Sequence, residues 1–81
     1  MTPRERQIVD ALSAVLARDD LPALATARFD ELGLDSLAGL RLAARLEAGM
    51  KVPIDVEWLY DHPSARQLAA FLNAHLDLPT P

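Results

Sequence analysis

The sequence has no cysteine among its 81 residues. A disulfide framework, a thiolate zinc site and a cysteine nucleophile are therefore excluded, and any thiol chemistry needs a sulfur that another molecule supplies. Aromatic residues are also scarce, at 5% of the chain, whereas apolar residues make up 51% and are mostly leucine and alanine. This composition is typical of a folded helical domain and not of a disordered tail.

Positive charge is in short supply. The chain has 8 basic and 12 acidic residues, and its net charge is -4 at pH 7. This sign argues against nucleic-acid binding, because affinity for phosphate backbones comes from lysine and arginine. Apolar runs are far shorter than the roughly 20 residues that cross a bilayer, and the first ten residues contain no apolar signal core. We therefore expect a soluble, cytoplasmic protein that binds neither nucleic acid nor membrane.

The length suits one domain with a thin core. A chain of this size buries only about 60–65% of its unfolded surface, so a deep catalytic cleft is not expected. Helical spacing of apolar residues predicts an all-α, four-helix bundle, with three main helices, a short helix third in order and a long first loop. We expect a single domain over 1–81, with its core over about 3–76 and a flexible tail over 77–81.

Capping patterns predict where the first and last helices begin. The first helix follows Thr2, with proline at its first position and glutamate at its third, and is expected to end near Arg18. The last helix opens at Ser64, with glutamine three residues later in the same capping-box arrangement. Between the first two main helices, residues 19–34 lack a helical period and contain Pro22. We expect an ordered loop there, and its length suggests a function.

The second main helix is expected from about Ser36 to Ala48. Asp35 is its predicted N-cap, and Gly49 is the predicted left-handed residue that ends it. The short third helix is expected within "VPIDVEWLYDHP", where Asp55 would provide its cap and the proline at the end would force the chain out.

This second helix has two apolar stripes. Leu42 and Leu46 form one that can pack on the first and last helices. Leu37, Leu40 and Ala44 form another, rotated away from the first. A wide core stripe is one interpretation of this pattern. The other is a docking surface, because neighbouring exposed apolar residues usually mark an interaction site.

Ser36 allows three interpretations. It could cap the helix, although Asp35 already occupies the better capping position. It could be a catalytic nucleophile, for which the sequence offers only His62 and His75 as bases and no glycine-rich oxyanion loop. It could also carry a phosphate-linked group, since a phosphodiester at the first residue of a helix lies beside free backbone N–H groups and the positive end of the macrodipole.

The segment "FDELGLDSLAGLRLAARLE" resembles the core of acyl and peptidyl carrier proteins, in which an LGxDSL motif carries 4'-phosphopantetheine on its serine. The downstream "VEWLYDHPSARQLAAFL" is similar to the short third helix and final helix of carrier domains from polyketide and nonribosomal peptide pathways. The resemblance covers about residues 8–76. It implies that Ser36 is the attachment site, that the arm comes from coenzyme A, and that the missing thiol is at the end of this arm.

The same resemblance implies a partner surface. In the family, the aspartate before the serine helps the transferase to recognise it, the exposed stripe of the second helix faces partner enzymes, and the start of the third helix flanks the arm. The expected partner-binding residues are Asp35, Leu37, Leu40, Arg41, Ala44, Ile54 and Val56. We expect no metal site in the carrier and no catalytic activity of its own.

One feature departs from carriers of the fatty-acid type, whose second helix is acidic. Here Arg41 and Arg45 stand against Glu47 alone, which favours a secondary-metabolite pathway, because charge complementarity governs partner choice. From the extent of the chain we expect a discrete, monomeric carrier. Its expected partners are a phosphopantetheinyl transferase and an acyltransferase, adenylating ligase or ketosynthase. The alternative function is a small helical interaction module in which Ser36 only caps the helix.

Overall fold

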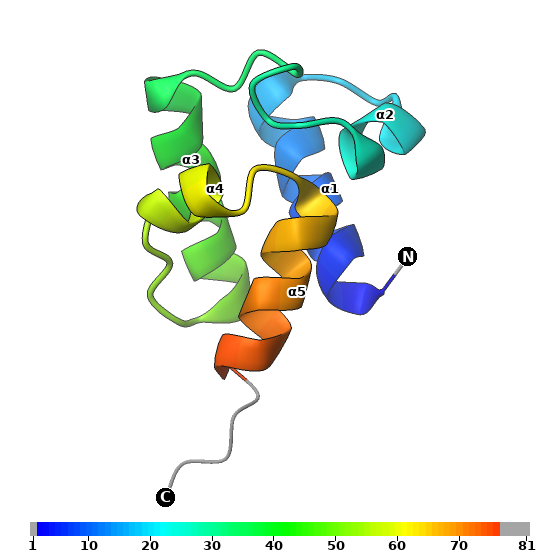
Figure 1. Ribbon diagram of the computed structural model, residues 1–81. Helices are drawn as coiled ribbons and strands as arrows, with labels where there is room; N and C mark the ends of the chain where they lie inside the picture. Colours follow the sequence, from blue (N-terminus) through cyan, green and yellow to red (C-terminus); the bar gives the residue numbers. More distant parts are fainter. Residues whose placement is uncertain (1, 77–81) are drawn as a thin grey trace, which may run out of the picture.

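The computed structural model describes residues 2–76, and this part of the chain folds into helices connected by short loops (Figure 1). The helices are α1 (Pro3–Leu16), α2 (Leu21–Thr26), α3 (Ser36–Met50), α4 (Glu57–Asp61) and α5 (Ala65–Leu76). Helix α1 packs against α2, α3 and α5. The predicted all-α fold is confirmed, and the tail predicted over 77–81 lies outside the described residues.

The core lies where α1, α3 and α5 meet. Burial of these side chains from water is the main source of stability in so small a domain. Its largest fully buried side chains are Ile8, Val9, Leu12, Leu24, Leu42, Leu46, Leu68 and Leu72.

The predicted helix starts at Thr2 and Ser64 are confirmed. The hydroxyl of Thr2 accepts a hydrogen bond from the Glu5 N–H at 3.1 Å, and the hydroxyl of Ser64 accepts one from the Gln67 N–H at 3.2 Å. Helix α1 ends slightly before the predicted Arg18, with Ala17 in the left-handed conformation at φ 54°. Each serine or threonine satisfies a backbone donor that the helix itself leaves unpaired.

The segment 19–34 is not a continuous loop, because it contains the short helix α2. Pro22 does not interrupt this helix but lies in its first turn, where an N–H group would have no helical acceptor in any case. The hydroxyl of Thr26 donates to the carbonyl of Pro22 at 2.8 Å. Leu24 is completely buried, so packing against the core stabilises a helix too short to show a period in the sequence.

The predicted end of the second main helix is wrong. Gly49 lies inside α3, which continues to Met50, and Lys51 adopts the left-handed conformation at φ 59°. The absence of a side chain at Gly49 matters for packing, because a Cβ atom there would lie 3.2 Å from Nε2 of Gln7 in α1. The helix therefore ends where its hydrogen bonding ends, with the Lys51 N–H donating to the Glu47 carbonyl at 2.7 Å.

Helix α4 is short and is capped partly as predicted. Val56 occupies the backbone position before the helix, while Oδ1 of Asp55 accepts a hydrogen bond from the Glu57 N–H at 2.9 Å. The Asp55 carboxylate thus accepts a hydrogen bond from the first turn of α4, although Asp55 lies one residue before the N-cap position. Leu59 is buried and anchors this turn to the core.

The end of the first loop is tied to the start of α5. Arg28 and Ser64 form an isolated antiparallel bridge, and the Phe29 N–H donates to the Pro63 carbonyl at 2.7 Å. Phe29 itself is buried. This contact between distant parts of the chain fixes the segment that leads into α3.

Candidate functional site: the surface around Ser36

Ser36 is the first residue of α3 and is exposed. The N-cap is Asp35, whose Oδ1 accepts the Ala38 N–H at 2.8 Å and whose carbonyl accepts the Gly39 N–H at 2.8 Å. Asp35 therefore caps the helix as predicted, and the hydroxyl of Ser36 forms no hydrogen bond with any residue in the described range 2–76. Capping does not explain why a serine stands at this position.

The chain has three serines, and the structure places them differently. The hydroxyl of Ser13 donates to the Arg18 carbonyl at the end of α1. Ser64 is buried and caps α5. Only Ser36 combines exposure with a hydroxyl that makes no hydrogen bond within the described part of the chain.

The two candidate bases lie elsewhere. The His62 ring stacks on Phe71 with 4.2 Å between ring centroids, and the His75 ring lies 4.9 Å from that of Trp58 in an edge arrangement. Both histidines belong to an aromatic cluster of α4 and α5. Within residues 2–76 neither forms a hydrogen bond with Ser36, so the structure does not assemble the base–nucleophile pair that a serine hydrolase needs.

The backbone at Ser36 suits an anion. The N–H groups of Ser36 and Leu37 lie in the first turn of a helix of 15 residues and donate to no residue in the described range. These unpaired donors carry the positive end of the helix macrodipole, which favours a negative charge by about 0.3–1 kcal/mol at an exposed position. A phosphodiester on the Ser36 oxygen would therefore be stabilised by the fold that presents it.

An exposed apolar surface lies beside Ser36. Leu37 and Leu40 on α3 have 59% and 55% of their surface exposed, and Ala44 continues their stripe one turn further. On α4, Tyr60 is 61% exposed, and Val56, directly before this helix, is half-buried. Exposed large apolar residues gathered on two adjacent helices are typical of a protein interaction site. Arg41 and Asp35, also predicted to contact partners, are exposed as well.

Ile54 does not belong to this surface. Its side chain is only 4% exposed and its N–H donates to Oε1 of Glu47 at 2.9 Å. Its neighbours Pro53 and Asp55 are exposed, so the turn after α3 directs only Ile54 toward the core. The prediction of Ile54 as a partner-binding residue therefore fails on accessibility.

Tyr60 was not among the predicted partner-binding residues, yet it is exposed beside them. A tyrosine in a short helix is expected to anchor that helix to the core, whereas here Trp58 does so, with its ring centroid 5.1 Å from that of Phe71. The signal for Tyr60 in the sequence was its spacing of four residues from Val56, which puts both side chains on one face of α4.

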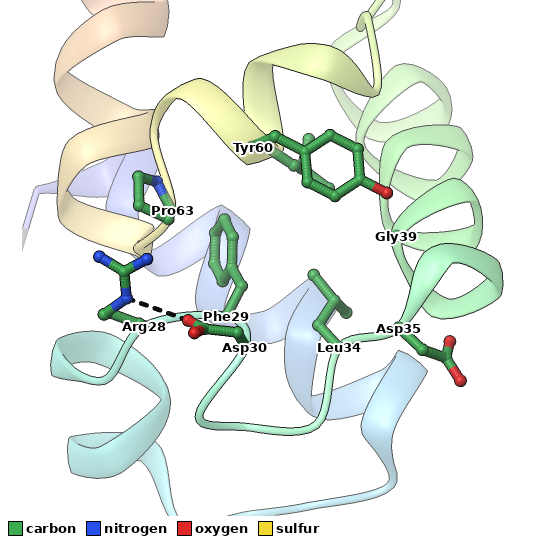
Figure 2. A pocket seen from close by; sticks show the side chains of 9 residues that line it. Arg28, Phe29, Asp30, Leu34, Asp35, Gly39, Tyr60 and Pro63 are labelled. Carbon is green, nitrogen blue, oxygen red and sulfur yellow. Dashed lines mark hydrogen bonds and ion pairs between the residues drawn. The ribbon is translucent and has the colours of Figure 1, made fainter.

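A cavity of about 190 Å³ opens next to Ser36, between the end of the first loop, α3 and α4 (Figure 2). Asp35 and Gly39 lie on the α3 side of this cavity, and Tyr60 extends across it from α4. The other residues that line it are Arg28, Phe29, Asp30, Leu34, Leu59 and Pro63.

An ion pair stiffens the loop at the edge of this cavity. Nε of Arg28 lies 3.0 Å from Oδ1 of Asp30, and Figure 2 shows this contact as a dashed line. The hydrogen bond from Arg28 lowers the pKa of the Asp30 carboxyl group below its ordinary value. The backbone N–H of Arg28 also donates to Glu31 at 3.2 Å, so this short stretch is fixed by several local contacts.

Neither a membrane span nor a metal cluster occurs within the described residues. No helix among them is long and apolar enough to span a bilayer. Likewise, residues 2–76 contain no cluster of three or more histidine or acidic side chains with the proximity that a metal ion requires.

The model of a family described as "Phosphopantetheine attachment site" matches residues 6–72. The isonitrile lipopeptide synthase of Streptomyces coeruleorubidus is 41% identical over 67 residues, covering 83% of this chain and 4% of the relative. A component of the phenolphthiocerol/phthiocerol polyketide synthase of Mycobacterium tuberculosis is 38% identical over 74 residues, covering 91% of this chain and 3% of the relative.

A third relative, erythronolide synthase EryA2 of Saccharopolyspora erythraea, is 32% identical over 83 residues, covering 94% of this chain and 2% of the relative. The chain thus corresponds to a small part of each of these proteins. The resemblance predicted from the LGxDSL pattern is confirmed by this agreement of family model, relatives and helical fold. On these grounds the chain belongs to the phosphopantetheine attachment site family and is a carrier domain homologous to those of polyketide and lipopeptide synthases.

Proposed function

We propose that Ser36 carries 4'-phosphopantetheine and that this chain moves an acyl or aminoacyl intermediate between enzymes of a secondary-metabolite pathway. A phosphopantetheinyl transferase attaches the group from coenzyme A through a phosphodiester on the Ser36 oxygen. Once attached, the group supplies a terminal thiol that holds the intermediate as a thioester. This accounts for a thiol-dependent function in a chain that has no cysteine.

The observation that carries the proposal is the state of Ser36. It is exposed, its capping role is taken by Asp35, and the first-turn N–H groups beside it suit the charge of a phosphodiester. The exposed leucines of α3 give visiting enzymes a surface to contact immediately next to the modified atom. The carrier's own part is therefore to present the serine, stabilise the phosphate charge and be recognised, while partner enzymes supply the chemistry.

The proposed partners are a phosphopantetheinyl transferase together with an acyltransferase, adenylating ligase or ketosynthase. The similarity to segments of polyketide and lipopeptide synthases supports a pathway of this kind. That the chain acts as a discrete, monomeric protein stays a prediction. The mass of the protein isolated from its producing cells tests it, because a carrier that is part of a larger synthase gives a much larger mass.

Intact mass after incubation with coenzyme A and a promiscuous transferase tests the attachment site. The wild-type chain is expected to gain one phosphopantetheine group and Ser36→Ala to gain none. Ser13→Ala is the matched control, because it removes another serine hydroxyl and is expected to be modified like the wild type. A folded wild-type chain whose mass stays unchanged would overturn the proposal, as would modification of Ser36→Ala.

A Val56→Asp variant tests the partner surface separately from the attachment site. Val56 is half-buried at the edge between α3 and α4, so a charge there should disturb an approaching enzyme more than the core. We expect slower acyl transfer to or from a ketosynthase with an unchanged circular dichroism spectrum. Unchanged turnover would remove Val56 from the surface.

A further inference from the structure

Two exposed arginines line one edge of α3. Arg41 and Arg45 are one helical turn apart, so their side chains lie on the same side of the helix. Arg45 borders a shallow groove that Gln7 and Asp10 of α1 also line, which places this edge toward α1. It is the edge of α3 that lies farther from α4.

Two exposed carboxylates stand on the outer side of α4. Glu57 and Asp61 are also one turn apart, and both point away from the buried Leu59. Helix α4 lies against the opposite edge of α3, because a Cβ atom at Gly39 would lie only 4.0 Å from Cδ2 of Leu59 in α4. The acidic pair and the basic pair thus flank α3 and α4 from opposite sides.

Between these edges lies the apolar surface already described. On the side toward α1, this surface begins with the arginine pair. The stripe of Leu37, Leu40 and Ala44 follows, and then the apolar face of α4. The acidic pair lies beyond that face. None of the four charged side chains forms an ion pair with another residue of the described chain. They are available to a partner.

We propose that the surface beside Ser36 docks a partner enzyme with charges of both signs: carboxylates opposite Arg41 and Arg45, and basic side chains opposite Glu57 and Asp61. The proposal rests on the carrier function proposed above and specifies which partners fit. Because each edge attracts only the opposite sign, the pattern fixes the rotation of the carrier about Ser36 as well as its affinity. A partner enzyme whose active-site entrance is basic throughout is repelled by Arg41 and Arg45.

A partner enzyme fits this surface better than a second copy of the chain. The whole chain carries a net charge of -4, so two copies repel each other at long range. A second copy seated on Leu37 and Leu40 would also cover Ser36, the atom that partners must reach. An enzyme with an opening at this position leaves that atom accessible.

Two purified ketosynthase domains serve as probes, chosen from their structures. The active-site entrance of one is basic throughout, and that of the other is acidic on one side and basic on the opposite side. The holo chain, loaded with one acyl group and verified by intact mass, is assayed for acyl transfer at low and high salt. The test variant is Arg41→Glu/Arg45→Glu, which makes both edges acidic.

The matched control is Lys51→Glu/Arg66→Glu, which changes the net charge equally at exposed positions outside the surface. Wild type is expected to react faster with the two-signed ketosynthase. In the test variant kcat/KM should fall roughly three- to thirtyfold with that enzyme and rise with the basic one. High salt should reduce both differences, because it screens exposed charges.

Equal effects of the test variant on both ketosynthases would overturn the proposal, as would a control effect of the same size. A concentration-dependent dimer in sedimentation, abolished by Arg41→Glu/Arg45→Glu, would assign the surface to a second copy and also overturn it. A chain that cannot be loaded refutes the carrier function instead. In that case chemical-shift titration of the unmodified chain with the same two ketosynthases still tests the charge pattern.

Discussion

The inner and outer faces of α3 carry the same kinds of side chain with opposite roles. Leu42 and Leu46 are buried in the core, whereas Leu37 and Leu40 are exposed beside Ser36. Apolar character alone does not distinguish these pairs, but their angle around the helix does. The inner face contributes to stability, and the outer face is the one we propose for recognition, so substitutions on the two faces should separate these properties.

The largest expected effect is on the inner face. Leu46→Ala removes a side chain that is only 1% exposed and should lower the free energy of unfolding by about 2–5 kcal/mol. Leu40→Ala, the matched change on the outer face, should lower it by less than about 0.5 kcal/mol. Urea denaturation followed by circular dichroism measures both. Similar losses for the two variants would break the distinction between the faces.

The second prediction concerns the N-terminal end of α3. Asp35→Ala removes the bond to the Ala38 N–H and should lower the free energy of unfolding by about 0.5–2 kcal/mol. Ser36→Ala should leave it almost unchanged, because the Ser36 hydroxyl makes no hydrogen bond within residues 2–76. Thermal melts of the unmodified proteins compare them. A large loss from Ser36→Ala would restore the capping interpretation of this serine.

Gly39 offers a smaller test, because it is a buried glycine at the end of the first turn of α3. A Cβ atom there would meet Cγ2 of Val56 at 3.9 Å and Cδ2 of Leu59 at 4.0 Å, both ordinary contacts. Gly39→Ala should therefore raise the free energy of unfolding by about 0.5–1 kcal/mol, through the higher helix propensity of alanine. Denaturant titration checks the sign. A loss of stability would show that the inner face has less space here than the contacts indicate.

The smallest expected effect lies outside α3, at the ion pair of Arg28 and Asp30. Because Arg28 lowers the pKa of Asp30 in the folded state, the pair stabilises the fold at neutral pH, and this contribution is lost as the pH falls below about 4. Asp30→Asn should be slightly less stable than wild type at pH 7 and equally stable in acid. Melting curves across this pH range test it, and a difference that persists in acid would exclude the ion pair as its cause.

Local signals in the sequence predicted the helix starts well. Thr2, Asp35 and Ser64 each stand at a cap whose donor lies three residues away, so no distant contact is needed to recognise them. The LGxDSL pattern is equally local, which is why Ser36 could be singled out from the sequence.

Features that depend on distant contacts were missed. Helix α2 has no side-chain cap and is stabilised by the burial of Leu24. The end of α3 was placed too early, because glycine is the usual left-handed residue at a helix end, whereas here Lys51 takes this conformation and Gly49 lies inside the helix. The burial of Ile54 and the exposure of Tyr60 were also missed, since the path of the chain after α3 decides which of them faces the core.

The bridge between Arg28 and Ser64 joins segments that are far apart in the chain. During synthesis, the segment that leads into Ser36 therefore cannot be fixed until the beginning of α5 has left the ribosome. A growing chain that lacks this helix has the serine but not the tether that positions it. With the proposed function, attachment of the prosthetic group should follow the emergence of α5, so that chains truncated before this helix are not modified.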